Sequence, residues 1–94
     1  MVIKIFVSKT CPKCPAAKEL GAELEKQNIK VEYWDIGGRD GLAEAAFFSV
    51  LSTPSIIVVD NKEQEVTGWR GEIPSSETLS KALLSMGQAE HGSA

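Results

Sequence analysis

Residues 2–15 read VIKIFVSKTCPKCP, a short apolar segment followed by a loop and two cysteines. The segment 2–7 is rich in β-branched residues and apolar on both faces, which is typical of a strand buried in a parallel sheet. Residues 8–10 form a loop. A helix is expected to begin near Pro12, because the fixed φ and missing N–H of proline suit a first helical turn. The stretch therefore predicts a buried strand that leads to a C-x-x-C pair at a helix start.

The rest of the chain continues this alternation of strands and helices. The first helix carries apolar residues at helical spacing up to about Asn28, and Gly21 within it indicates close packing onto a sheet. Further strands are expected at 29–34, 55–59 and 64–69, and further helices at about 42–51 and from Ser75 or Ser76 to Met86. The order β-α-β-α-β-β-α predicts an α/β fold with a mixed four-stranded sheet and three helices.

The distribution of polar residues predicts how the strands are arranged. Segments 2–7 and 55–59 are the most apolar, so they should lie in the centre of the sheet. Segments 29–34 and 64–69 alternate with polar residues and should be its edges. The first β-α-β unit should be parallel with a right-handed crossover, and segment 64–69 should return antiparallel.

The length of 94 residues predicts one domain, because domains usually have roughly 50–250 residues. We assign residues 1–87 to this domain, with Gly87 ending the last helix. Residues 88–94 are small and polar and are expected to form a flexible tail.

Composition excludes several classes of protein. Hydrophobic residues make up 43% and charged residues 24%, which is ordinary globular usage and argues against disorder, collagen and coiled coil. No apolar run approaches the roughly 20 residues of a membrane span. The net charge of −3 argues against nucleic-acid binding. No signal-peptide pattern follows Met1, so a cytoplasmic protein is expected.

The chain has few residues that could hold a metal. Its two cysteines are too few for a disulfide scaffold or for a four-ligand zinc site. The single histidine, His91, lies near the end of the chain and is given no role. No protein metal site is predicted, and attention falls on the cysteine pair itself.

The position of Cys11 and Cys14 favours redox chemistry. Residues three apart in a helical turn have Cβ atoms about 5–6 Å apart, within reach of a disulfide. Unpaired N–H groups and the helix dipole stabilise a thiolate at the helix start. We therefore predict Cys11, before the helix, as the attacking thiolate and Cys14, one turn in, as the resolving cysteine. Lys9 and Lys13 add positive charge, and Pro12 stiffens the turn.

The sequence resembles the thioredoxin superfamily, and within it the glutaredoxin-like branch. The residues that carry the resemblance are Cys11-Pro12-Lys13-Cys14, Thr53-Pro54 ahead of an apolar strand, and Gly68-Trp69-Arg70-Gly71. The resemblance spans residues 2–87 and implies a thioredoxin-like fold. It also implies a small thiol–disulfide oxidoreductase that takes part in electron transport.

The resemblance further implies site residues and partners. Pro54 would be cis and face the cysteines, and the backbone of Thr53 would pair with an extended substrate segment. Lys9 matches a contact to the glutathione carboxylate, so glutathione is a possible co-substrate, with no bound cofactor. The Trp69 and Gly71 pattern looks more like proteins that accept electrons from thioredoxin reductase. Substrates would be protein or small disulfides, and the protein is expected to be monomeric.

For several other residues the sequence allows both a functional and a structural interpretation, or a structural one alone. Trp69 either packs on the sheet edge or contacts the partner, and Arg70 is either a surface charge or a carboxylate ligand. We predict core positions for Tyr33, Phe47 and Phe48. The roles of Trp34 and Asp35 stay open.

Two alternatives use the same cysteines. A soft-metal carrier for copper or zinc also places C-x-x-C after its first strand, but such carriers have the order β-α-β-β-α-β. An iron–sulfur cluster could instead be held between two chains with glutathione, and Pro12 argues against this by family resemblance. The predicted element order and the Thr53-Pro54 pair favour the oxidoreductase.

Overall fold

The sheet has the predicted strands in the predicted order. The structure is a computed structural model that describes residues 1–93, with side chains described through Ser85. The elements are β1 (Val2–Val7), α1 (Cys14–Lys26), β2 (Val31–Asp35), α2 (Arg39–Phe47), β3 (Ser55–Val59), β4 (Glu65–Arg70) and α3 (Ser76–Ser93). The strand order is β2-β1-β3-β4, with β1 and β2 parallel and the other two pairs antiparallel. The central and edge positions are therefore confirmed.

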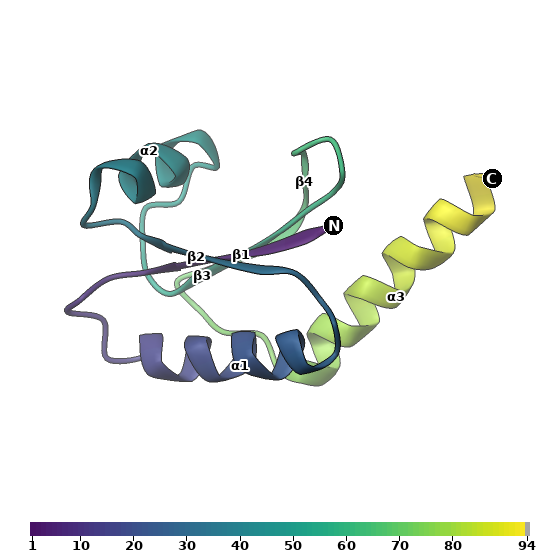
Figure 1. The fold of residues 1–94 in the computed structure, drawn as a ribbon, viewed down its shortest axis with the longest axis horizontal. Helices are drawn as coiled ribbons and strands as arrows, with labels where there is room; N and C mark the ends of the chain where they lie inside the picture. The colour runs from purple at the N-terminus through teal and green to yellow at the C-terminus, as the bar shows by residue number, and fades with distance from the viewer. Residues whose placement is uncertain (94) are drawn as a thin grey trace.

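The helices cover the sheet on two sides. Figure 1 shows α1 and the first turns of α3 below the sheet and α2 above it, while the rest of α3 extends away from the strands. Side chains of β1 alternate between these layers, as the pleat of a strand requires. Ile3 and Ile5 belong to the core cluster between the sheet and α1, which also contains Cys14. Phe6 belongs to the core cluster between the sheet and α2. The first strand thus connects both halves of the core.

Several helix boundaries differ from the expected ones, including the end of α2, which lies at Phe47 rather than at about Leu51. Helix α1 begins at Cys14 rather than near Pro12, so Pro12 belongs to the preceding loop. Helix α2 begins at Arg39, three residues earlier than expected, and α3 continues through Gly87 to Ser93. The predicted helix end at Gly87 is wrong, because a glycine inside a helix costs only about 1 kcal/mol and does not by itself stop it. The division into a domain and a flexible tail stays a prediction.

Two aromatic residues predicted for the core lie at the surface. Phe48 is buried as expected, but the Phe47 side chain is 72% exposed, because α2 turns only its Phe48 side toward the sheet. Tyr33 is 42% exposed, and its hydroxyl donates to a carboxylate oxygen of Glu25 at 3.2 Å. Its ring covers Gly21, where a Cβ would overlap the tyrosine hydroxyl, so the predicted close packing at Gly21 is confirmed.

A buried lysine occupies the central strand. The segment 2–7 is not apolar on both faces, because Lys4 is only 3% exposed and points to the α2 side. Its ammonium lies 3.1 Å from a carboxylate oxygen of Glu32, 2.6 Å from Glu44 and 3.4 Å from Glu63. The rings of Trp34 and Phe48 lie 5.4 and 5.5 Å away. These partners compensate the charge, which a buried lysine requires.

The ion pairs shift the pKa values of the groups that form them. Burial opposes the charge on Lys4, but its hydrogen bonds to Glu44 and Glu32 outweigh this and raise its pKa. Burial likewise opposes the charge on Glu32, yet the hydrogen bond from Lys4 holds the pKa of that carboxyl below its usual value. Both groups are therefore charged at neutral pH.

Helix α2 packs closely against the end of β2 at Gly41. A Cβ there would overlap the backbone carbonyl of Asp35, which cannot move without displacing the strand end. We expect Gly41→Ala to lower the free energy of unfolding by about 1–3 kcal/mol, the usual cost of forced overpacking, as measured by urea titration. Gly38→Ala is the matched control, because its Cβ would lie 3.5 Å from the same carbonyl oxygen, an ordinary contact. Equal losses in both variants would contradict this packing argument.

Within residues 1–93, none of the helices combines the length and apolar character that a membrane span requires.

Candidate dithiol site

The two cysteines lie where β1 gives way to α1, and they form a disulfide. Their Cα atoms are 5.4 Å apart, within the usual range for a disulfide. Cys14 is the first residue of α1 and is only 3% exposed, whereas Cys11 lies in the loop before the helix and is partly exposed. The predicted difference in exposure is therefore confirmed, and Cys11 is the more accessible of the two cysteines.

Backbone hydrogen bonds hold this loop in a tight turn. The Cys11 N–H donates to the Ser8 carbonyl at 3.4 Å, and the Cys14 N–H donates to the Cys11 carbonyl at 3.3 Å. Pro15 occupies the first turn of α1, where the missing N–H costs nothing. The chain between the cysteines, Pro12 and Lys13, is exposed.

The charges around Cys11 favour a thiolate in the reduced protein. Helix α1 has no acidic residue in its first turn, and Lys13 at its N-cap makes no side-chain capping bond. The unpaired N–H groups of this turn and the helix dipole therefore place positive potential next to the sulfurs. Lys9 and Lys13 are both exposed in the same loop. Such surroundings stabilise a thiolate.

The loop before β3 is tied to the end of β1. The bond between Thr53 and Pro54 is cis, and Pro54 is buried. The hydroxyls of Ser8 and Thr53 share a hydrogen bond of 3.0 Å. The Pro54 carbonyl accepts the Gly71 N–H at 2.9 Å, which connects this loop to the residues after β4. Segments from three parts of the chain are thus joined next to Ser8, three residues before Cys11.

Trp69 and Arg70 point to opposite faces of β4. Trp69 is half-buried and packs against the core cluster that contains Cys14, so it lies on the α1 side. Arg70 lies on the α2 side, and its guanidinium donates to Glu65 at 2.6 and 3.1 Å and to the Phe48 carbonyl at 2.8 Å. The hydrogen bond to Glu65 raises the pKa of Arg70. The charge of Arg70 is therefore used within the protein and is not directed at the cysteines.

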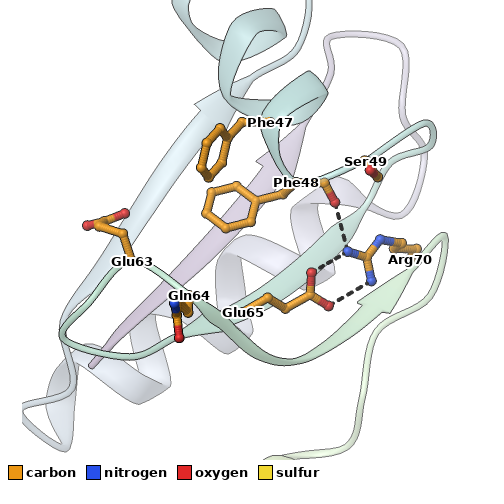
Figure 2. Close-up of a pocket in the computed structure, with 7 residues that line it drawn as sticks. All are labelled: Phe47, Phe48, Ser49, Glu63, Gln64, Glu65 and Arg70. Carbon is orange, nitrogen blue, oxygen red and sulfur yellow. Dashed lines mark hydrogen bonds and ion pairs between the residues drawn. The ribbon is translucent and has the colours of Figure 1, made fainter.

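Arg70 lines a shallow pocket of about 360 Å³ with Phe47, the last residue of α2, and Phe48, which follows it. Figure 2 shows its guanidinium held between the Glu65 carboxylate and the Phe48 carbonyl, with the rings of Phe47 and Phe48 beside the pocket. The two rings meet edge to face with centroids 4.9 Å apart. Since this pocket lies on the α2 side of the sheet, it does not include the disulfide.

A second depression of about 340 Å³ lies next to the cysteine loop. Its lining comes from the ends of β1 and β2: Ser8, Lys9, Thr10, Asp35, Gly37 and Gly38. Sequence reasoning left Asp35 without a role. The sequence did contain a signal for its position. Segments 2–7 and 29–34 were predicted to be parallel strands, and the carboxyl ends of neighbouring parallel strands meet at one edge of the sheet. In the structure Val7 and Asp35 are paired across these strands.

No group of three histidine, cysteine, aspartate or glutamate side chains suited to a metal ion occurs among the residues that the structure describes.

Comparison with known proteins finds a consistent set of relatives. The family described as Thioredoxin domain matches residues 1–84. A thioredoxin from Methanocaldococcus jannaschii is 29% identical over 84 residues, covering 86% of this chain and 89% of that protein. A probable thioredoxin from Archaeoglobus fulgidus is 28% identical over 61 residues, covering 64% of this chain and 67% of that protein.

The fold is also found among solved structures. Thioredoxin 1 from Thermosipho africanus superposes with a TM-score of 0.76 at 20% identity, covering 96% of this chain and 99% of that chain. A thioredoxin from Thermus thermophilus superposes with a TM-score of 0.63 at 21% identity, covering 90% and 72%. At these identities the likeness shows a shared fold, and it agrees with the strand order described above.

Proposed function

Because the chain belongs to the thioredoxin domain family and is a thioredoxin-like oxidoreductase, we propose that it reduces disulfides through Cys11 and Cys14. The observation that carries this proposal is the unequal exposure of two close cysteines at the positive end of α1. One sulfur can reach a substrate, and the other is held behind it within reach. This is the arrangement that a two-step thiol–disulfide exchange requires.

The reaction begins with the reduced dithiol. The Cys11 thiolate attacks one sulfur of a substrate disulfide, and the other substrate sulfur leaves as a thiolate. The Cys14 thiolate then attacks the Cys11 sulfur of the mixed disulfide and releases the second substrate thiolate. Two electrons pass from the dithiol to the substrate, and the protein is left with the Cys11–Cys14 disulfide.

The neighbouring residues have supporting roles in this scheme. Lys13 and the first turn of α1 stabilise the thiolate, and Pro12 limits movement of the loop between the two redox states. The loop at Thr53 and Pro54 binds an extended substrate segment, and this segment pairs with the Thr53 backbone as a short added strand. The hydrogen bond between Ser8 and Thr53 holds that loop beside the cysteine loop.

The proposed cellular location and substrates follow from the same chemistry. A dithiol that must be returned to its reduced form suits the cytoplasm, where thiols are kept reduced. Protein disulfides and small disulfides are the proposed substrates, and the chain acts as a monomer.

The source of electrons distinguishes a thioredoxin-like from a glutaredoxin-like function for this chain. We propose thioredoxin reductase, because Trp69 and Gly71 stand where glutaredoxins typically carry a Gly-Gly pair. A coupled assay that follows NADPH oxidation with insulin as substrate compares thioredoxin reductase with glutathione plus glutathione reductase. We expect turnover with thioredoxin reductase to exceed turnover with glutathione at least tenfold. The opposite order would assign the chain to glutathione, and no turnover in either arm would reject disulfide reduction.

A further inference from the structure

The depression next to the cysteine loop carries one acid and one base that do not neutralise each other. Lys9 and Asp35 both line it, and both are exposed. No ion pair joins them, and neither pairs with another charged group among residues 1–85. Opposite charges that share a depression without pairing are available to a ligand that carries both signs.

The position of the Asp35 carboxylate is fixed by the loop after β2. Its Oδ1 accepts the Gly37 N–H at 2.8 Å, and its backbone carbonyl accepts the Gly38 N–H at 3.0 Å. No hydrogen bond to Oδ2 is found within residues 1–85. One carboxylate oxygen therefore orients the side chain, and the other can accept a hydrogen bond from a ligand.

The depression is continuous with the reactive loop. Thr10, the residue before Cys11, lines it, and so does Ser8, whose carbonyl accepts the Cys11 N–H. Its volume of about 340 Å³ lies at the lower end of the roughly 300–1,000 Å³ that is usual for small-molecule sites. The depression therefore borders the loop that carries Cys11, and a group attached to the Cys11 sulfur would extend over Thr10 to enter it.

We propose that this depression is a subsite for disulfides whose sulfur is flanked by an α-amino acid, with Asp35 receiving the ammonium and Lys9 the carboxylate. The inference rests on the proposed disulfide reduction and names a substrate class for it. L-cystine is the smallest such substrate. The Cys11 thiolate attacks one of its sulfurs and releases one cysteine thiolate; Cys14 then attacks Cys11 and releases the second. The two cysteine molecules that are released take their protons from water, and the protein dithiol supplies the two electrons.

The test uses single turnovers of the fully reduced protein, followed by tryptophan fluorescence or by thiol titration. Four small disulfides serve as probes: L-cystine, cystamine with ammonium groups alone, 3,3′-dithiodipropionate with carboxylates alone, and the uncharged 2-hydroxyethyl disulfide. Each rate constant is divided by that for 2-hydroxyethyl disulfide with the same variant. This ratio removes any effect of a substitution on the reactivity of the Cys11 thiolate itself.

Two substitutions separate the roles of the two charges. Asp35→Asn keeps the oxygen that accepts the Gly37 N–H and removes the charge. We expect it to lower the normalised rates for cystine and cystamine about fivefold, the effect of one exposed ion pair, and to spare dithiodipropionate. Lys9→Gln should lower the normalised rates for cystine and dithiodipropionate by a similar factor and spare cystamine.

Matched controls exclude a general charge effect. Asp40→Asn and Lys18→Gln remove the same charges from exposed positions that do not line the depression. If Asp40→Asn lowers the cystamine rate as much as Asp35→Asn does, or if Asp35→Asn affects all charged probes alike, the subsite is rejected. Reduction of 2-hydroxyethyl disulfide without charge selectivity would also reject it while leaving disulfide reduction intact. Failure to reduce any probe would reject both.

Discussion

Replacing Cys11 with serine is expected to reduce disulfide turnover to the rate measured without protein. A serine hydroxyl cannot form the mixed disulfide, so the reaction loses its first covalent step and is not merely slowed. Cys14 should not take over, because only 3% of its surface is exposed and it lies within the core cluster. The measurement is insulin reduction with dithiothreitol as the electron source, corrected for the reaction of dithiothreitol alone.

Replacing Cys14 with serine is the matched comparison and should give a different result. Cys11 can still attack a substrate, but no second thiol releases it. We expect a stable mixed disulfide between Cys11 and the substrate, visible by mass spectrometry as one added thiol per chain. Full turnover by Cys11→Ser, or a mixed disulfide on Cys14 in that variant, would contradict the assigned roles.

The largest effect on stability is expected from Lys4→Met. Methionine fills a similar volume but leaves Glu32, Glu44 and Glu63 close together without their cation. Breaking a buried ion pair by removing one partner costs about 3–5 kcal/mol. We expect about 3 kcal/mol at pH 7, because these carboxylates keep partial access to water. Urea titration followed by circular dichroism measures this loss.

The loss in Lys4→Met should become smaller as the pH falls. In the native protein the pKa of Glu32 is below its ordinary value of 4.5, so its stabilising effect is present above that pH and is lost as the pH falls through the native value. In the variant the crowded carboxylates repel one another, and protonation relieves this repulsion. Free energies of unfolding measured from pH 7 to about pH 3 should therefore approach each other as the pH falls below the ordinary value of 4.5.

The same linkage has an alkaline side. The pKa of Lys4 is above its ordinary value of 10.5, so its contribution is complete below that pH and is lost as the pH rises through the native value. Lys18→Met is the control, since Lys18 is exposed on α1 and forms no ion pair within residues 1–85. A loss in Lys4→Met no larger than in this control would show that the buried charges add nothing to stability.

The sequence predicted the sheet well because its signals were local and strong. Segment 55–59 is continuously apolar and coincides with β3, and the polar alternation of the two outer segments predicted their edge positions. Helix ends were predicted less well. Asn28 follows α1 with a φ of 63°, a left-handed conformation that asparagine tolerates and that ends a helix. Gly87 does not end its helix, and α3 continues through it.

Other differences arose because the deciding partners are distant in sequence. Lys4 could not be recognised as a buried charge from segment 2–7, since Glu32, Glu44 and Glu63 come from three other parts of the chain. Phe47 and Phe48 are adjacent and equally apolar, and only the orientation of α2 decides which of them is buried.

Within the site, the motif and its resemblance were sufficient to predict that the two cysteines lie close together and that the bond before Pro54 is cis. The sequence was not sufficient for Arg70, whose guanidinium turns to Glu65 on the far face of the sheet. It also left Asp35 unassigned, although the predicted parallel pairing of β1 and β2 already brings the carboxyl ends of these strands to one edge of the sheet.

The alternation of side chains along β1 has a consequence for the evolution and engineering of this protein. Because Lys4 and its carboxylates lie on the α2 side and Cys14 lies on the α1 side, the sheet acts as a partition between two charge environments. Three of the chain's carboxylates are thereby held around Lys4, on the face of the sheet that does not carry Cys14. The α2 side could be redesigned to change solubility, attach a label or add an affinity tag while the electrostatics of the thiols are left largely undisturbed.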